Sequence, residues 1–430
     1  MRKRLLVALS MSCFFANCDF NFANARDHET VVSQERIRRD YSISTVDLNN
    51  QTDLHIVVAK DLDRTNQYLG HPTTVLLDDG QTIIAAFPTG HGRGKLRFCR
   101  SNNGGKAWQT MKAPDIDLHE VPTLFKTETP DGRSRIVLTT CVPKTGDFRW
   151  MVSDDGGGSW SKLQSEDLGL KRGIIVALSS MWQLRDSENR PINQWRGVFH
   201  DFAFDNFTID LSFAKDPNAY GGWNTVWSKA KKITFASANG LENSKNAQLC
   251  EAGFVRSPEG NEIALLFRPQ AKKTNAMISF SSNEGETWDD PKELPGSLTG
   301  ERHVARYGPD GWLLVCFRDY SPLNKNNPHH ADWVGWVGRW QDLKRGSEGQ
   351  YRIRLKDNYG NSTNNNVGDC GYTAIELIED VFVCTSYGHW ELASGQQAPN
   401  GKGRPPFVIA TRFKLADLDR LLKQSKTQNE

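Results

Sequence analysis

The amino-acid sequence predicts an all-β protein, a six-bladed β-propeller, and three observations support this fold class. Short segments of alternating apolar and polar residues recur along most of the 430-residue chain, separated by Gly, Asp, Pro and Asn. The pattern Ser-x-Asn/Asp-x-Gly-x-x-Trp occurs three times. The segments can also be grouped into six similar units. Period-two alternation is typical of half-buried strands, and a repeated multi-strand unit is typical of a propeller blade.

The three repeats begin at Ser101, Ser153 and Ser281 and end at Trp108, Trp160 and Trp288. The first two are 52 residues apart, and the second and third are 128 residues apart, which is close to two further periods. A decayed copy begins at Ser212 and ends at Trp223. In such a turn the Asn or Asp side chain bonds the local backbone, Gly supplies a positive φ and Trp covers the turn. We expect each turn to join the third and fourth strands of a blade.

Each of the six units is expected to contribute an inner, a second and a third strand. The inner strands are predicted to begin near His71, Glu120, Ile174, Glu251, Arg302 and Tyr372. The second strands are predicted near residues 83–87, 135–141, 195–199, 262–267, 312–317 and 381–385, and the third near 96–100, 150–153, 208–213, 276–281, 333–340 and 407–413. The last unit has no fourth strand of its own, and residues 54–59 are expected to supply it. Seven blades are the alternative.

Both ends of the chain have features that lie outside the propeller. Residues 1–4 are basic, residues 5–15 form a short apolar run, and Ala23-Asn24-Ala25 matches a signal-peptidase site. We therefore expect a signal peptide over 1–25, a propeller domain over 26–413 and a C-terminal helix and tail over 414–430, with the helix at 415–423. The predicted location is secreted or periplasmic, with neither a lipid anchor nor an integral membrane span.

Composition excludes several function classes. The net charge of +2 gives no strong field for nucleic acid. Six cysteines follow the predicted signal peptide, without a C-x-x-C pair. Export would permit disulfides, but Cys99, Cys316 and Cys384 lie within apolar strand patterns that favour buried thiols. We expect no cofactor and no bound metal.

Polar residues at the predicted starts of the inner strands are the candidate site, because those positions converge on one end of the central channel. Five of the six starts carry such a group: His71, Glu120, Glu251, Arg302 and Tyr372. Ligands favour openings of this kind. Each residue also has a structural interpretation, such as capping a strand, lining the channel or, for Glu251, pairing with Arg268.

Taken with the repeats, the residues at these inner-strand starts resemble those of the sialidase-like (BNR or Asp-box repeat) propellers, and the resemblance covers most of residues 65–413. In that family a fourth-blade Glu activates a sixth-blade Tyr nucleophile, and arginines hold the substrate carboxylate. The resemblance assigns Glu251 and Tyr372 to the first two roles, and Arg268 and Arg302 to substrate binding. A phenol beside a carboxylate can lose its proton to it, and guanidinium groups can make bidentate contacts to an anion.

Two positions depart from the family pattern. The first-blade Arg is replaced in Gly70-His71-Pro72, and the loop that should carry an acidic Asp contains His91 and Arg93 instead. The resemblance therefore implies a divergent enzyme that cleaves a glycosidic bond in a sialic- or uronic-acid-containing glycan. His71, His91, Glu251 and Tyr372 are the predicted catalytic residues, and Arg93, Glu120, Arg268 and Arg302 the predicted substrate-binding residues. A hydrolase is favoured. The alternatives are a polysaccharide lyase that uses His and Tyr for β-elimination and a non-catalytic glycan-binding propeller.

Overall fold

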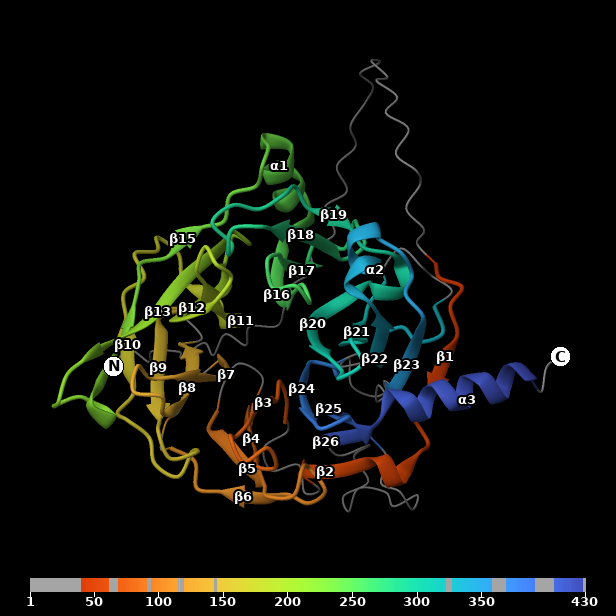
Figure 1. Cartoon of the computed structure of the whole chain (residues 1–430), viewed down its shortest axis with the longest axis horizontal. Helices are drawn as coiled ribbons and strands as arrows, with labels where there is room; N and C mark the ends of the chain where they lie inside the picture. Colours follow the sequence, from red (N-terminus) through yellow and green to blue (C-terminus); the bar gives the residue numbers. More distant parts are fainter. Residues whose placement is uncertain are drawn as a thin grey trace, which may run out of the picture. The chain divides into compact units, whose positions relative to one another are not determined.

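A computed structural model describes residues 40–61, 69–90, 94–114, 116, 120–142, 145–321, 327–357, 369–390 and 406–427, with the side chains of Glu120 and residues 424–427 left out. Contacts group Arg38–Glu430 as one unit. Within it the described strands form six sheets, arranged around a common centre (Figure 1). The predicted six-bladed β-propeller is therefore confirmed.

In each blade the inner, second, third and outermost strands pair antiparallel, and the inner strand faces the centre. The inner strands are β3 (Thr73–Leu76), β7 (Glu120–Glu128), β11 (Ile174–Arg185), β16 (Leu249–Arg256), β20 (Gly300–Tyr307) and β24 (Thr373–Ile378). The second strands are β4 (Ile83–Pro88), β8 (Ser134–Cys141), β12 (Pro191–Asp201), β17 (Ile263–Pro269), β21 (Leu313–Asp319) and β25 (Val381–His389). Their positions agree with the sequence pattern to within a few residues.

The outer half of each blade is more variable. The third strands are β5 (Leu96–Ser101), β9 (Phe148–Ser153), β13 (Asn206–Lys215), β18 (Met277–Ser281), β22 (Trp333–Gly338) and β26 (Pro406–Phe413). The outermost strands are β6 (Gln109–Met111), β10 (Gln164–Glu166), β14 (Trp223–Trp227), β19 (Lys292–Glu293), β23 (Tyr351–Lys356) and β2 (His55–Lys60), and the short β15 (Lys231–Lys232) also pairs with β13.

The N-terminal segment closes the ring. Strand β2 pairs antiparallel with β26 and so completes the last blade, as the sequence predicted. Just before it, β1 (Thr45–Asp47) adds a parallel strand to the edge of β23 in the fifth blade. The sequence did not indicate β1, because three residues are too few to show alternation. One short segment thus covers the outer edges of two adjacent blades, which would otherwise expose unpaired backbone groups.

Hydrophobic packing joins neighbouring blades. All six residues of β4 are buried, as are all six of β22. These strands lie between adjacent sheets, so both of their faces are covered and their sequences are almost continuously apolar. One core cluster accordingly combines side chains from β22 and β23 of the fifth blade with others from β25 and β26 of the sixth. The six cysteines after residue 25 are also buried, as predicted for Cys99, Cys316 and Cys384.

The three repeat turns have the hydrogen bonds that their sequence pattern indicates. In the first, Ser101 Oγ accepts from the Gly105 amide at 2.8 Å and Asn103 Oδ1 accepts from the Ala107 amide at 2.9 Å. The indole of Trp108 donates to the Gly105 carbonyl. Ile83 pairs with Ser101 on one side and Leu76 on the other. These turns therefore lie at the opposite end of the blades from the inner-strand starts.

Among the described residues, three α-helices accompany the strands. The C-terminal helix α3 spans Leu415–Thr427, longer than predicted. Helix α1 (Ala238–Ala247), which the sequence did not indicate, is capped by Ser237 Oγ, which accepts from the Gly240 amide. The third strand predicted over 333–340 was too long, because Trp340 begins helix α2 (Trp340–Arg345). There the Arg339 amide donates to Asp342 Oδ2 at 2.7 Å, a bond that favours a helix start over a continuing strand.

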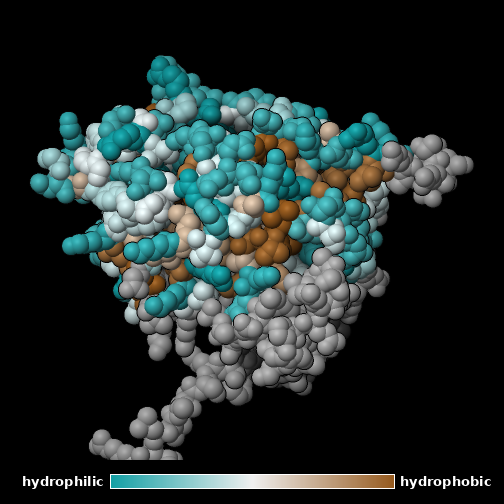
Figure 2. All heavy atoms as spheres, turned by 90° about the horizontal axis from the view of Figure 1, so that it is seen from below, coloured by the Kyte–Doolittle hydropathy of each residue, from teal (hydrophilic) through white to brown (hydrophobic). Residues whose placement is uncertain are grey.

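Figure 2 shows the molecule from below, where hydrophilic atoms cover most of the coloured surface and hydrophobic atoms occupy a smaller central area. Within the described ranges, no helix has both the length and the hydrophobicity to span a bilayer. The same residues contain no group of three or more His, Cys, Asp or Glu placed to hold a metal ion. The predicted signal peptide lies outside the described residues.

Candidate active site at the channel mouth

The channel mouth, defined here as the end where the inner strands begin, has an unusual backbone. His71, Glu251 and Arg302 all have positive φ angles, of 51°, 48° and 57°. Residues other than Gly rarely adopt this left-handed conformation, and it costs free energy. Irregularities in strand register accompany it between Cys250 and Gly253 and between Glu301 and Val304. Such bulges redirect side chains and are concentrated next to functional sites.

Tyr372 follows Gly371, which has a φ of 83° and so fits the same turn without a side-chain penalty. The Tyr372 hydroxyl donates to Glu251 Oε2 at 2.7 Å, across the channel mouth from the sixth blade to the fourth. Arg268 Nη1 donates to the same phenolic oxygen at 2.5 Å and to Glu251 Oε2 at 3.0 Å. A phenol, a carboxylate and a guanidinium are therefore in mutual contact.

The electrostatics of this triad fix its protonation. Burial opposes ionisation of Glu251, but the charges of Arg268 and Arg302 and the Tyr372 hydrogen bond outweigh it and lower its pKa to about 2. Burial raises the pKa of Tyr372 well above its ordinary value, against the opposing effect of Arg268. At neutral pH the resting site therefore contains a carboxylate and a neutral phenol, which is the arrangement a base and its nucleophile need before reaction.

A second layer of charge supports the triad. Glu301 accepts from Arg268 Nη2 at 3.1 Å and from Arg318 Nη2 at 2.6 Å, so one carboxylate bridges two guanidinium groups. Arg318 also lies over the Tyr372 ring, with its Cζ 4.6 Å from the centroid, and pairs with Asp369 at 3.4 Å. Because these groups are largely buried, each arginine is held by charge-assisted hydrogen bonds in a fixed geometry.

The ring of His71 lies beside the ring of Tyr372. The centroid of its ring is 5.0 Å from that of Tyr372 and 5.1 Å from that of Tyr387. Tyr387 in turn donates its hydroxyl to Asp369 Oδ1 at 2.6 Å. The imidazole is buried and in contact with the ring of the tyrosine, so it occupies a place where it could transfer a proton to or from a substrate bound at that residue.

Two further histidines, His200 and His303, lie beside the mouth and are almost completely buried. Burial, together with the Arg268 and Arg302 charges, lowers the pKa of His200 to about 4, against the opposing effect of Glu251. Burial likewise lowers the pKa of His303 to about 4, and its Nε2 contacts the Leu298 carbonyl oxygen at 3.1 Å. Both imidazoles are therefore neutral at pH 7 and act as packing groups behind the charged cluster.

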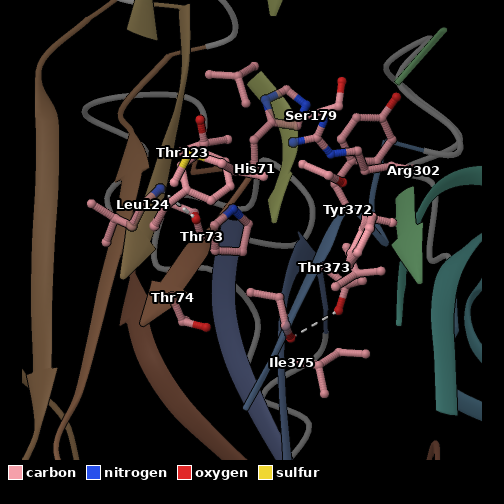
Figure 3. A pocket seen from close by; sticks show the side chains of 18 of the residues that line it. His71, Thr73, Thr74, Thr123, Leu124, Ser179, Arg302, Tyr372, Thr373 and Ile375 are labelled. Carbon is pink, nitrogen blue, oxygen red and sulfur yellow. Dashed lines mark hydrogen bonds between the residues drawn. The ribbon is translucent and has the colours of Figure 1, made fainter. Parts of the chain in front are cut away.

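Arg302 differs from the other two arginines at the mouth. Its side chain is buried, with 8% of the residue exposed, but it forms no salt bridge with any described residue. Its Nη1 is buried without a hydrogen-bond partner. Arg302 lines a central cavity together with His71, Tyr372 and Ser179, which are labelled in Figure 3. Among the arginines described at the mouth, Arg302 therefore differs from Arg268 and Arg318 in having no carboxylate partner.

The structure brings five of the predicted site residues together: His71, Glu251, Arg268, Arg302 and Tyr372. His91 and Arg93 lie outside the described residues. Glu120 begins β7, but its side chain is not described. The roles of His91, Arg93 and Glu120 therefore remain predictions.

The predicted site residues did not include Arg318, Glu301, Asp369 or Tyr387. The position of Arg318 in the sequence could have identified it. It is the penultimate residue of β21, as Arg268 is of β17, so aligning adjacent blades on their second strands pairs the two arginines. Glu301 could not be identified in this way, because its partners Arg268 and Arg318 lie on strands of two different blades.

Comparisons with known proteins support the fold. The chain matches no protein-family model, and no curated protein is significantly similar to it. Among solved structures, a protein of unknown function from Dyadobacter fermentans is similar with a TM-score of 0.54 and 14% identity, over 83% of this chain and 97% of that one. An α-L-arabinofuranosidase from Fusarium graminearum gives a TM-score of 0.51 at 11% identity, over 85% and 98%. The NanB sialidase from Streptococcus pneumoniae gives 0.51 at 11% identity, over 84% and 70%. These likenesses and the sheet topology show that the chain is a six-bladed β-propeller of the sialidase type.

Proposed function

We propose that the protein is an enzyme that cleaves a glycosidic bond in a glycan, with Tyr372 as nucleophile and Glu251 as its base. The observation that carries this proposal is the Tyr372 hydroxyl, bonded to both Glu251 and Arg268 at the channel mouth. A tyrosine held in this way is poorly explained as a packing group, because burying charged groups costs desolvation that apolar residues of similar size would avoid. Structural similarity to a sialidase and an arabinofuranosidase is consistent with the proposal.

The first step would form a bond between the phenolic oxygen and the anomeric carbon. The Tyr372 proton passes to Glu251 as that bond forms, while the leaving-group oxygen takes a proton from an acid. Because the pKa of Glu251 is low and that of Tyr372 is high, transfer in the resting enzyme is unfavourable. Glu251 therefore acts as a base only as the phenol attacks the sugar. In the second step water hydrolyses the glycosyl–tyrosine bond.

His71 and His91 are the proposed sources of the acid. His71 is supported by its position beside Tyr372. His91 rests on the sequence, where it replaces the expected acidic residue. Imidazole is a suitable acid or base near neutral pH.

Arg302 supports an acidic substrate, because it has no carboxylate partner among the described residues. Arg268 and Arg318 are both bonded to Glu301, so they are less available to a sugar carboxylate. We therefore propose that one carboxylate of a sialic- or uronic-acid residue is held mainly by Arg302, assisted by Arg93, and that Glu120 accepts from a hydroxyl group of the sugar. The sequence of residues 1–25 supports export, so the substrate would be met outside the cytoplasm.

A panel of sialylated, uronate-containing and neutral glycans tests this proposal. Purified protein is incubated with each, and both new reducing ends and near-ultraviolet absorbance are measured. Reducing ends without absorbance support hydrolysis. Absorbance from a new double bond would instead support β-elimination by Tyr372 and His71. Binding without either product would leave a glycan-binding propeller, and Tyr372→Phe should then bind as well as wild type.

A further inference from the structure

The decayed repeat of the third blade differs from the three intact repeats in length. In each intact repeat Trp follows Ser by seven positions, whereas Trp223 follows Ser212 by eleven. The added residues form a loop between β13 and β14 that contains one turn of 3-10 helix, Tyr220–Gly222. Because this loop joins a third strand to an outermost strand, it lies at the same end of the blades as the repeat turns. It is therefore remote from the channel mouth.

A buried arginine of the second blade holds this loop in place. Arg135 is completely buried, and its Nη2 and Nη1 donate to the carbonyls of Tyr220 at 2.8 Å and of Trp223 at 2.9 Å. The same guanidinium pairs with Asp154, at 2.6 Å between Nε and Oδ1. The Tyr220 hydroxyl also lies 2.9 Å from that of Ser159, in the repeat turn of the second blade. The loop is thus fixed against the neighbouring blade by charge-assisted hydrogen bonds.

A pocket of about 610 Å³ lies between this loop and the third and outermost strands of the second blade. The second and third blades are neighbours in the ring (Figure 1). Three aromatic side chains line the pocket, Trp150 from β9 and Tyr220 and Trp223 from the third blade. Trp150 is buried, whereas the other two are partly exposed. The volume is in the range of about 300–1,000 Å³ that is typical of sites for small organic ligands.

The polar part of the lining consists mainly of side-chain amides. Gln164, Asn218 and Asn224 line the pocket and are exposed. Gln164 Nε2 donates to the Lys162 carbonyl and Asn224 Nδ2 to Asp216 Oδ2, each at 3.3 Å. A side-chain amide has two donors and an acceptor oxygen, so one such bond leaves capacity for a ligand. Among the described residues that line the pocket, Lys162 alone is charged and none is a carboxylate.

We propose that this pocket binds an uncharged sugar residue of a glycan, as a second binding site remote from the channel mouth. Aromatic rings present apolar faces to the C–H face of a sugar ring, and amides exchange hydrogen bonds with its hydroxyl groups. A lining without carboxylates does not suit a metal ion, and a single lysine is a poor match for a phosphate group.

The choice of a glycan as ligand rests on the proposed function. A polymeric substrate held in the pocket would keep its other residues close to the channel mouth, because a second binding event on the same chain has a high effective concentration. The pocket would therefore strengthen the binding of long glycans and leave the cleavage of short ones unchanged.

Electrophoresis in native gels that contain arabinogalactan, xylan or hyaluronan tests the site. Retardation of the protein as a function of polymer concentration gives a Kd for each polymer. We expect wild type to bind at least one of them, and Trp223→Ala to raise that Kd about fivefold or more. This substitution keeps the carbonyl that Arg135 binds. Asn224→Ala, at an exposed position, should raise the Kd by a smaller factor and covers the case in which Trp223→Ala fails to fold.

The matched control is Trp108→Ala, which removes the corresponding tryptophan of an intact repeat and should leave the Kd unchanged. Cleavage of a short soluble oligosaccharide should be the same in Trp223→Ala as in wild type. Retardation that depends on Trp223 without cleavage of any glycan would contradict the proposed enzymatic function but support the pocket. No retardation of wild type by any of the three polymers, or equal retardation of wild type, Trp223→Ala and Asn224→Ala, would overturn the proposal.

Discussion

The repeat turns and the channel mouth lie at opposite ends of the same blades and are stabilised in opposite ways. In each repeat turn the side chains of the Ser and of the Asn or Asp accept from amides within the same eight residues, as the bonds of Ser281 and Asn283 to the amides of Gly285 and Thr287 illustrate. The channel mouth instead joins Glu251, Glu301 and Tyr372 from three different blades. Its backbone is strained, and its charged groups are buried. Local hydrogen bonding therefore stabilises one end, while contacts between blades hold a buried cluster of charged groups at the other.

The largest expected effect is at the mouth. Tyr372→Phe removes the proposed nucleophile and should reduce kcat/KM on a cleaved glycan by about 10³-fold or more, while the circular dichroism spectrum is unchanged. Tyr387→Phe is the matched control, because it removes a neighbouring hydroxyl that donates to Asp369 rather than to Glu251. It should reduce kcat/KM by about tenfold at most. Equal loss in both variants would contradict a specific role for Tyr372.

Glu301→Gln should cause the largest loss of stability. It removes the carboxylate that bridges the buried Arg268 and Arg318, so both guanidinium groups lose a charged partner. Breaking a buried ion pair costs about 3–5 kcal/mol in the free energy of unfolding, which urea unfolding can measure. Glu376→Gln is the control, since its partner Arg306 has a side chain 45% exposed. It should cost less than half as much, and an equal cost would mean that the bridge has no special importance.

A smaller effect is expected from pH. The folded-state pKa of His303 is about 4 because of burial, below the ordinary 6.5. The unfolded chain therefore binds the proton more readily, and stability present above pH 6.5 is lost as pH falls towards 4. This one group should contribute a loss of about 3 kcal/mol. His303→Asn should reduce the difference in unfolding free energy between pH 7 and pH 4 by that amount.

The control for lost packing is Phe317→Leu, which changes the ring 5.0 Å from that of His303. It should lower stability equally at both pH values. If His303→Asn retained the full pH dependence of wild type, the neutral buried imidazole would be excluded as its source.

The smallest effect is expected at a repeat turn. Ser281→Ala removes the hydroxyl that accepts from the Gly285 amide at 2.9 Å. The free energy of unfolding should fall by about 1 kcal/mol, and kcat/KM should stay within twofold of wild type, because the turn lies far from the inner-strand starts. A large loss of activity would show that the two ends of the blade are coupled, contrary to the comparison above.

Sequence patterns could predict what is encoded locally. The repeat turns fixed the blade register, and that register placed His71, Glu251, Arg302 and Tyr372 at one end. The bridge through Glu301 could not be predicted in this way, because it depends on how second strands of neighbouring blades approach one another. Strand β1 and helix α1 were missed for a related reason. One is too short to show a period, and the other has a mainly polar sequence that resembles a loop.

The most direct test of a tyrosine nucleophile is the mass of the peptide that carries it. Wild-type protein would be acid-quenched during turnover of a cleaved glycan, digested and analysed by mass spectrometry. The account predicts that the peptide containing Tyr372 gains the mass of one sugar residue, and that Glu251→Gln lowers the amount formed. An enzyme that turns over at full rate with this peptide always unmodified would contradict it.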